Sequence, residues 1–290
     1  MRIASLVPSG TAIALALGLG DALVAVTDGC GLAGPPVVVR SAIDSARLPA
    51  AEIDRLVTAA AAAGASPYEV DEDLLRTLRP DVVLTQDTCA VCALPGDAAR
   101  LAAAPDARVI SLSPRGLEEV LDAVAAVAAA AGVPERGRDL LAALRARQGE
   151  VAARVAGRQT VPVACLEWLD PPFNAGHWMP DLVRAAGGVD PLAEAGAMSR
   201  RMSWPEVFAA GGAGVATAVC LPCSLGLERA AAEAGAVAWP GGWAVWAADG
   251  GRLFSGGTPA LWDGLEVLAA ILHPEAFPQG PDPSLARRIR

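Results

Sequence analysis

Two cysteines stand one helical turn apart directly after an apolar run, and their spacing allows several kinds of chemistry. Cys89 and Cys92 belong to the segment TQDTCAVCALP (85–95), which follows the apolar residues 82–84. A C-x-x-C pair can be a redox dithiol, half of a metal site, or two structural thiols. A thioredoxin-like pair opens a helix, whereas Pro95 and Gly96 would break one. Thiolate ligation of zinc, copper(I) or an iron–sulfur cluster therefore stays open beside a structural role.

The composition limits the classes of protein to which the chain can belong. It has 290 residues, of which 53% are hydrophobic, and a net charge of −9 from 32 acidic and 23 basic residues. This length fits two lobes or one large α/β unit. The acidic balance opposes nucleic-acid binding and gives no reason to expect an anionic membrane as partner. No uncharged apolar run reaches the roughly 18 residues of a spanning helix, so membrane insertion is not expected.

The cysteine content and the first residues indicate a cytoplasmic protein. Six cysteines are few for this length, which favours reduced thiols over a disulfide scaffold. The first 25 residues contain one early Arg and an apolar stretch, as a secretory signal does. However, residues 3–7 are typical of a strand, and residues 8–11 (PSGT) are typical of a turn that starts a helix. A signal peptide rarely places such a turn inside its apolar region, and we therefore expect a cytoplasmic location.

Strands are predicted to alternate with helices in both halves of the chain. The expected strands are 3–7, 23–27, 81–86, 108–112, 161–168, 216–221 and 252–254. The expected helices are 11–19, 50–63, 71–79, 179–186, 203–210, 225–234 and 259–272, with a long helical stretch at 117–156 that is interrupted at 132–137. Such alternation implies parallel pairing with right-handed crossovers. The sequence therefore predicts an α/β fold of two Rossmann-like lobes, 1–115 and 158–290, joined by a backbone helix at 116–157.

Polar and thiol side chains follow the predicted strands, at the edge where ligands bind in parallel sheets. These candidates are Ser9, Cys30, Gln86, Cys89, Cys92, Cys223 and Ser255. Cys165 and Cys220 lie inside apolar strands and are expected to be inert. We expect Cys30, Cys89, Cys92 and Cys223 to ligate a metal or an iron–sulfur cluster. A chance placement of four thiols is the alternative, and Ser9 could simply cap a helix.

The segment EWLDPPFNAGHW (167–178) gathers further candidates after a predicted strand. His177 could ligate a metal or transfer a proton, or it could be an ordinary hydrogen-bonding residue of a loop. Trp168 and Trp178 could line a flat conjugated ligand, with core packing as the alternative. If the protein is an enzyme, Glu167 and His177 are its candidate acid and base.

Five segments are similar to one protein family, and they occur in the family's order through nearly the whole chain. They are RIASLVPSGTAIALALGLGDALVAVTDGC, YEVDEDLLRTLRPDVVLTQDTCAVCA, CLEWLDPPFNAGHW, LPCSLGLERA and DGLEVLAAILHPEAFP. The chain thus resembles the signal-less, cytosolic branch of cobalamin-binding-protein-like sequences, relatives of the class III periplasmic substrate-binding proteins of ABC importers. The resemblance implies two α/β lobes joined by a rigid backbone helix, with a corrinoid or another metal chelate bound between them.

The same branch carries cysteines at the positions of Cys30, Cys89, Cys92 and Cys223. The chain departs from it at GCGLAG, which lacks the acid and the aromatic residue after Cys30, and at FSGGTPALW, where the branch has an aromatic–Ser–Arg–Pro pattern. These departures could mark a specialised member with a different ligand or reaction.

Two functions from different classes follow. The first is a cytosolic binding protein for a metal-containing cofactor, either a corrinoid-like chelate or a thiolate-bound metal or iron–sulfur centre, with Ser9, Gln86, Trp168, Trp178 and Ser255 as cofactor contacts. The second is a metal- or iron–sulfur-dependent enzyme that acts on a small molecule of a specialised pathway. Docking on an ABC transporter is not expected, because no export signal is evident.

Overall fold

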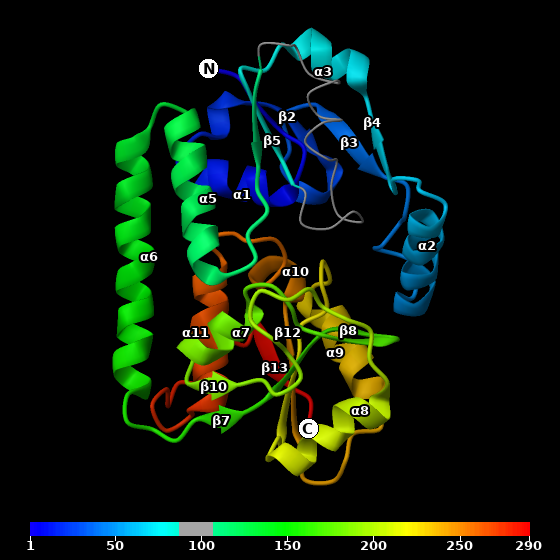
Figure 1. The fold of residues 1–290 in the computed structure, drawn as a ribbon, viewed down its shortest axis with the longest axis vertical. Coiled ribbons are helices and arrows are strands. Elements are labelled where there is room, and N and C mark those ends of the chain that lie inside the picture. The colour runs from blue at the N-terminus through cyan, green and yellow to red at the C-terminus, as the bar shows by residue number, and fades with distance from the viewer. Residues whose placement is uncertain (87–106) are drawn as a thin grey trace. The chain divides into compact units, whose positions relative to one another are not determined.

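A computed structural model describes residues 1–86 and 107–290, and the contacts of the chain divide it into two compact units (Figure 1). Unit 1 comprises residues 1–114, 118–142 and 256–259. Unit 2 comprises residues 115–117, 143–255 and 260–290. Cys89 and Cys92 lie outside the described residues, and the lobe boundaries at 115 and 157 stay a prediction.

Unit 1 is built on a sheet whose described strands run in the order β4-β3-β2-β1-β5-β6. The strands are β1 (Ile3–Ser5), β2 (Leu23–Thr27), β3 (Val37–Ser41), β4 (Tyr68–Val70), β5 (Val82–Thr85) and β6 (Arg108–Ser111). All neighbours pair in parallel except β4, which pairs antiparallel with β3 at the edge. Four of these strands match predicted ones, whereas β3 and β4 were not predicted.

Helices cover both faces of this sheet, and adjacent residues of β1 show that the strand is buried on both sides. The helices that contribute to its cores are α1 (Pro8–Ala16), α3 (Glu72–Leu78) and α5 (Leu117–Ala130), while α2 (Ala50–Ala62) connects β3 to β4. Ile3 packs into a core with residues of α1 and α5, whereas Ala4 packs on the other face with Leu75 of α3. Because side chains alternate along a strand, a sheet buried on both faces needs a continuous apolar run rather than a polar–apolar alternation.

The long helical stretch predicted between the lobes is two helices. α5 ends near Gly132, whose φ of 66° is left-handed, and Pro134 begins α6 (Pro134–Val155). This sequence, Gly after one helix and Pro at the start of the next, is a common way to end and restart helical structure. α6 starts in unit 1, where Arg136 donates to the carbonyls of Leu17 and Gly18 at 3.2 and 3.0 Å, and its residues from 143 onward belong to unit 2.

Unit 2 contains a second sheet in the order β13-β12-β11-β8-β9, with β8, β11 and β12 parallel and the two edge strands antiparallel. The strands are β8 (Ala164–Leu169), β9 (Pro172–Asn174), β11 (Thr217–Cys220), β12 (Ala244–Ala248) and β13 (Ala286–Arg288), beside a small parallel pair of β7 (Val161–Pro162) and β10 (Gly188–Val189). The helices are α7 (Met179–Ala185), α8 (Trp204–Ala209), α9 (Leu227–Ala236), α10 (Gly250–Leu253) and α11 (Leu261–Leu272).

The predicted fold class, α/β with parallel sheets, is confirmed. One predicted strand is wrong: residues 252–254 fall in and after the short helix α10, and the strand in this region is β12. α10 starts at Gly250 because Asp249 caps it by accepting the N–H of Arg252 at 2.9 Å.

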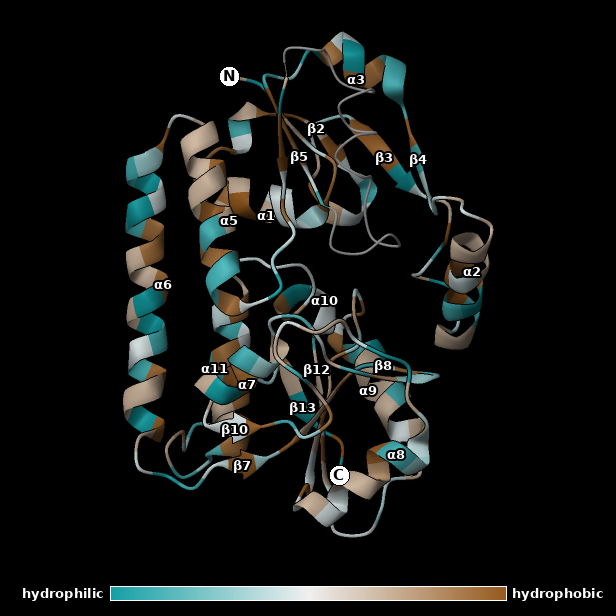
Figure 2. Cartoon of the chain, viewed as in Figure 1, coloured by the Kyte–Doolittle hydropathy of each residue, from teal (hydrophilic) through white to brown (hydrophobic). Residues whose placement is uncertain are grey.

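The hydropathy of the elements agrees with this layering. Figure 2 shows hydrophobic residues along β3 and β5, and many hydrophilic residues along α6. Trp262 is fully buried, and Trp204 packs with Phe208 and Trp239 at ring distances of 5.4 and 5.5 Å, so both serve the core. In the described part of the chain, no helix combines the length and apolar character that crossing a membrane requires.

Asp190 is a buried carboxylate whose titration should appear in the stability of unit 2. Its carboxylate accepts the N–H groups of Cys165 and Leu192 at 3.0 and 2.9 Å. Burial outweighs these hydrogen bonds and raises the pKa of Asp190 from 3.8 to about 6. Between pH 3.8 and about 6, the folded state therefore keeps the Asp190 carboxyl group protonated, whereas the unfolded state releases the proton.

The contribution of Asp190 to the free energy of unfolding should be largest below about pH 4 and should be lost as the pH rises through 6. A shift of this size corresponds to about 3 kcal/mol at most. The variant Asp190→Asn should lack this component, which urea unfolding of both proteins between pH 4.5 and 7.5 measures. A wild-type-minus-variant difference that is constant across this range would contradict the assignment.

Candidate functional site

Glu167, near the carboxyl end of β8, connects two loops of unit 2. Its backbone carbonyl accepts the N–H of Cys223 at 2.8 Å, at the exit of β11. Its carboxylate Oε2 accepts the N–H of Gly176 at 3.2 Å, in the loop after β9. Glu167 thus places the cysteine-bearing turn and the histidine-bearing loop at the same edge of the sheet.

The loop that carries His177 is held in an unusual backbone conformation. His177 has a φ of 55°, a left-handed value that is uncommon for a residue with a side chain. Its N–H donates to Ala197 O at 2.7 Å, and its carbonyl accepts the N–H of Gly196 at 3.2 Å. A Cβ on Gly176 would lie 2.3 Å from Ser199 N, so only glycine fits there. The contacts with segment 196–199 therefore fix the direction in which the His177 side chain projects from the backbone.

The imidazole of His177 has one ring nitrogen available for a ligand. Nε2 is shielded from water and has no hydrogen-bond partner among the described residues. Burial, followed by the positive charge of Arg115, lowers the pKa of His177. The ring is therefore neutral at neutral pH, the form in which imidazole ligates metals or accepts a proton.

Trp178 and the segment after α10 connect His177 to Cys223. The rings of His177 and Trp178 lie 5.5 Å apart, and the indole N–H of Trp178 donates to Phe254 O at 3.2 Å. The next residue, Ser255, places its Oγ 3.4 Å from the Sγ of Cys223. Ser255 Oγ also accepts the N–H of Ser224 at 2.8 Å and lies 2.9 Å from Gly250 O. The structure thus brings Glu167, His177, Trp178, Cys223 and Ser255 together within unit 2.

The four described thiols fall into two classes. Cys30 and Cys223 are partly exposed, and each sulfur accepts a hydrogen bond, from the N–H of Leu32 at 3.5 Å and from Ser255 Oγ respectively. Cys165 and Cys220 are buried, and burial raises the pKa of both thiols well above the ordinary value. Accessible sulfurs that accept hydrogen bonds fit thiolate ligation, and the buried thiols fit the predicted inert role.

The remaining predicted cofactor contacts are Ser9 and Gln86 in unit 1 and Trp168 in unit 2. Ser9 and the turn Asp28–Cys30 lie together in unit 1, since a Cβ on Gly29 would contact Pro8 Cγ at 3.4 Å. Gln86 is partly buried directly after β5. Trp168 is half-buried, and its indole N–H donates to Asp170 O at 3.1 Å, so the ring is tied to the turn between β8 and β9.

The four-cysteine site stays a prediction. Among residues 1–86 and 107–290, no three or more His, Cys, Asp or Glu side chains are grouped closely enough to hold a metal ion. Cys30 belongs to unit 1 and Cys223 to unit 2, while the other two predicted ligands lie outside the described residues.

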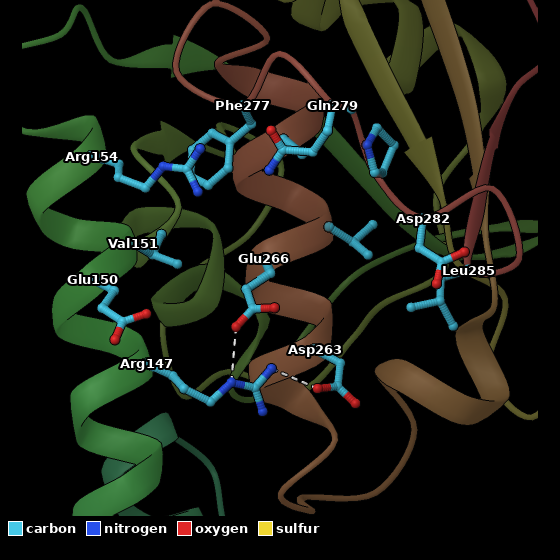
Figure 3. Close-up of a pocket in the computed structure, with 14 residues that line it drawn as sticks. Arg147, Glu150, Val151, Arg154, Asp263, Glu266, Phe277, Gln279, Asp282 and Leu285 are labelled. Atoms are coloured by element: carbon cyan, nitrogen blue, oxygen red, sulfur yellow. Dashed lines mark hydrogen bonds and ion pairs between the residues drawn. The ribbon is translucent and has the colours of Figure 1, made fainter.

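A separate pocket of about 390 Å³ lies on the helical side of unit 2, among α6, α11 and the segment that follows α11 (Figure 3). Arg147 donates to Asp263 at 2.6 Å and to Glu266 at 2.8 Å, and the guanidinium of Arg154 lies 3.8 Å over the ring of Phe277. The two guanidinium groups are thus already engaged by the pocket's own residues. None of the predicted site residues lines this pocket.

Comparisons with solved structures show where this fold occurs. The chain is 20% identical to the periplasmic vitamin B12 binding protein of Vibrio cholerae, covering 95% of this chain and 97% of that one with a TM-score of 0.66. It is 19% identical to a periplasmic heme binding protein of Pseudomonas aeruginosa, covering 99% and 97% with a TM-score of 0.67. It is 20% identical to the periplasmic heme-binding protein of Roseiflexus sp. RS-1, covering 95% of this chain and 98% of that one with a TM-score of 0.65. These likenesses show a shared fold.

The comparison of sequences gives the family directly. No curated protein matched the chain. The family model described as periplasmic binding protein matches residues 3–210, which is well over half of the chain. The resemblance to the class III substrate-binding proteins is therefore confirmed by both sequence and fold. This chain belongs to the periplasmic binding protein family.

Proposed function

We propose that this protein binds a metal-containing cofactor in the cytoplasm. The ligand is a corrinoid-like chelate or a metal or iron–sulfur centre held by thiolates from Cys30, Cys89, Cys92 and Cys223. The observation that carries the proposal is the connected set His177–Trp178–Phe254–Ser255–Cys223, which presents an unpaired imidazole nitrogen and an accessible thiol in one unit. Imidazole and thiolate are ligands that zinc, copper and iron accept in proteins.

Two further observations support this proposal. Solved structures with this fold are named for binding vitamin B12 or heme, both of which are metal chelates. The side chains around His177 are also fixed before any ligand binds, by the hydrogen bonds of Glu167, Ala197 and Phe254. A site whose groups are already ordered loses less entropy on binding, which favours affinity.

The hydrogen bond through which Glu167 holds the His177 loop favours a binding protein over an enzyme. One oxygen of its carboxylate accepts the N–H of Gly176, so this group holds the His177 loop in place. A catalytic Glu167 would need to exchange a proton with a substrate while keeping that bond. In the binding protein, the carboxylate has only the structural task.

The variant Glu167→Gln separates these two functions. The amide oxygen of Gln can still accept the N–H of Gly176, so a binding protein should keep its ligand affinity within about tenfold. If Glu167 instead transfers protons, the variant should bind ligand normally but turn over roughly 10²–10⁴-fold more slowly. Affinity and product formation, measured at matched metal content, give the answer. Loss of turnover with cofactor and substrate still bound would overturn the pure binding function.

A further inference from the structure

The first turn of α1 contains hydrogen-bond donors for which residues 1–86 and 107–290 supply no acceptor. α1 has nine residues and starts at Pro8. Val7 precedes it without a side-chain cap, and its first turn contains no acidic residue. The N–H groups of a first helical turn have no acceptor within the helix. That of Thr11 reaches Val7 O at a long 3.4 Å. The helix itself therefore supplies no counter-charge for the positive end of its dipole.

Two buried hydroxyl groups add to these donors. Ser9 and Thr11 are 5% and 1% exposed, and neither Ser9 Oγ nor Thr11 Oγ1 has a hydrogen-bond partner among the described residues. Buried hydroxyls are normally paired, because an unpaired one has lost its bonds to water without replacement. By contrast, Ser5, at the end of β1, is equally buried and donates to Val7 O at 2.8 Å. The unpaired hydroxyls are thus confined to the helix itself.

Two glycine residues, Gly256 and Gly29, lie beside the first turn of α1 and present backbone to it instead of side chains. Gly256, which belongs to unit 1 and has a left-handed φ of 66°, faces Ser9: a Cβ added to it would lie 3.3 Å from Ser9 Cβ and 4.0 Å from Ser9 Oγ. On the side of the Cys30 turn, Gly29 takes the place next to Pro8. Glycine beside a helix N-terminus is a common arrangement around bound phosphate and carboxylate groups, because it lets the anion approach the N–H groups.

We propose that the first turn of α1 is a subsite for an oxyanion, a carboxylate or phosphate group, that accepts hydrogen bonds from the Ser9 hydroxyl and from the N–H groups at the start of the helix. The hydroxyl of Ser9 and the N–H groups of Ser9 and Gly10 are the donors, and the helix dipole supplies the charge complement. The unpaired hydroxyl of Thr11 lies in the same turn. The anion is a substituent of the bound ligand or a free ion.

This subsite requires neither cysteine ligation nor His177, so it can be tested on metal-free protein, and its failure would leave the proposed function standing. The probes are inorganic phosphate and acetate, titrated at constant ionic strength with chloride as the reference anion. The readout is the midpoint of thermal unfolding for wild type and for the double variant Ser9→Ala/Thr11→Val. The wild-type midpoint should rise saturably, by about 5 °C at a hundredfold excess over the dissociation constant. The variant should show only the general stabilisation that phosphate gives any protein.

Without anion, the unfolding midpoint of the same double variant provides a second test. Removing two unpaired buried hydroxyls should leave its midpoint unchanged or raise it, whereas hydroxyls with a structural role would lower it. The matched control is Ser5→Ala, which removes a paired buried hydroxyl beside the same helix: it should lower the midpoint and keep the anion response.

Each outcome decides the proposal. A response to phosphate alone assigns a phosphate group, a response to acetate alone assigns a carboxylate, and a response to both assigns a general oxyanion site; all three support the subsite if the double variant loses them. Equal responses of wild type and double variant, or a double variant that is destabilised without anion, would overturn it.

Discussion

Replacement of Cys223 by Ser is expected to remove most of the bound metal from the protein. The same result is expected for Cys30→Ser, Cys89→Ser and Cys92→Ser, because a hydroxyl is a much poorer ligand than a thiolate for zinc, copper(I) or iron–sulfur centres. Cys223 is the best defined of the four, since its sulfur is accessible and is fixed by Ser255 and by the bond from its N–H to Glu167. Metal content per chain, measured after purification without oxygen, gives the result.

The controls for this prediction come from the same chain. Cys165→Ser and Cys220→Ser change thiols that are fully buried in neighbouring strands and whose pKa is raised, so both variants should keep the metal. Thiolate ligands also require reduced cysteines, which mass spectrometry of freshly lysed cells checks. Equal metal retention in all six variants, or a stoichiometric Cys89–Cys92 disulfide in those cells, would contradict the thiolate site.

Substitution of Gly176 by Ala should disturb the His177 loop directly. The added carbon would lie 2.3 Å from Ser199 N and 2.8 Å from Met198 C, and both are backbone atoms that cannot move aside independently. Overpacking of this kind costs about 1–3 kcal/mol, and here the loop must shift to relieve it. The shift displaces His177, so ligand affinity should fall at least about tenfold as stability falls. Urea unfolding and ligand titration measure the two effects.

Gly241→Ala is the matched control for this substitution. A Cβ on Gly241 would meet nothing within 4 Å, and its φ is not left-handed. The control should therefore change neither stability nor affinity appreciably. If Gly176→Ala behaves like Gly241→Ala, the loop does not position the ligand group that the proposal assigns to His177.

The fold was largely predictable because its strands are buried on both faces. Continuous apolar runs such as residues 82–84 mark central parallel strands directly, and Pro134 and Gly132 mark the break between α5 and α6. The edge strand β4 and its neighbour β3 were missed because both are partly exposed, with Arg40 opposite Glu69 across them. Residues 252–254 were misassigned because the cap from Asp249 outweighs the strand character of Leu253 and Phe254.

The residues of the candidate site could be predicted from the sequence, but the contacts that connect them could not. Strand exits gave Glu167, His177, Cys223 and Ser255, because ligands collect at the carboxyl edge of parallel strands. The unpaired Nε2 of His177 and its neighbour Arg115 depend on contacts between distant segments, which no local pattern records. The same holds for the unpaired hydroxyls of Ser9 and Thr11: the sequence suggested a capping role for Ser9, but Val7 takes the cap position and Ser9 lies inside the helix.

The metal content and visible absorption of the protein, purified without oxygen, test the central proposal most directly. We expect close to one metal centre per chain, with the absorption of a corrinoid or an iron–sulfur cluster when one of these is the ligand and a colourless protein when the metal is zinc. Protein that has all six cysteines reduced, yet contains no stoichiometric metal and takes none up from solution, would contradict it.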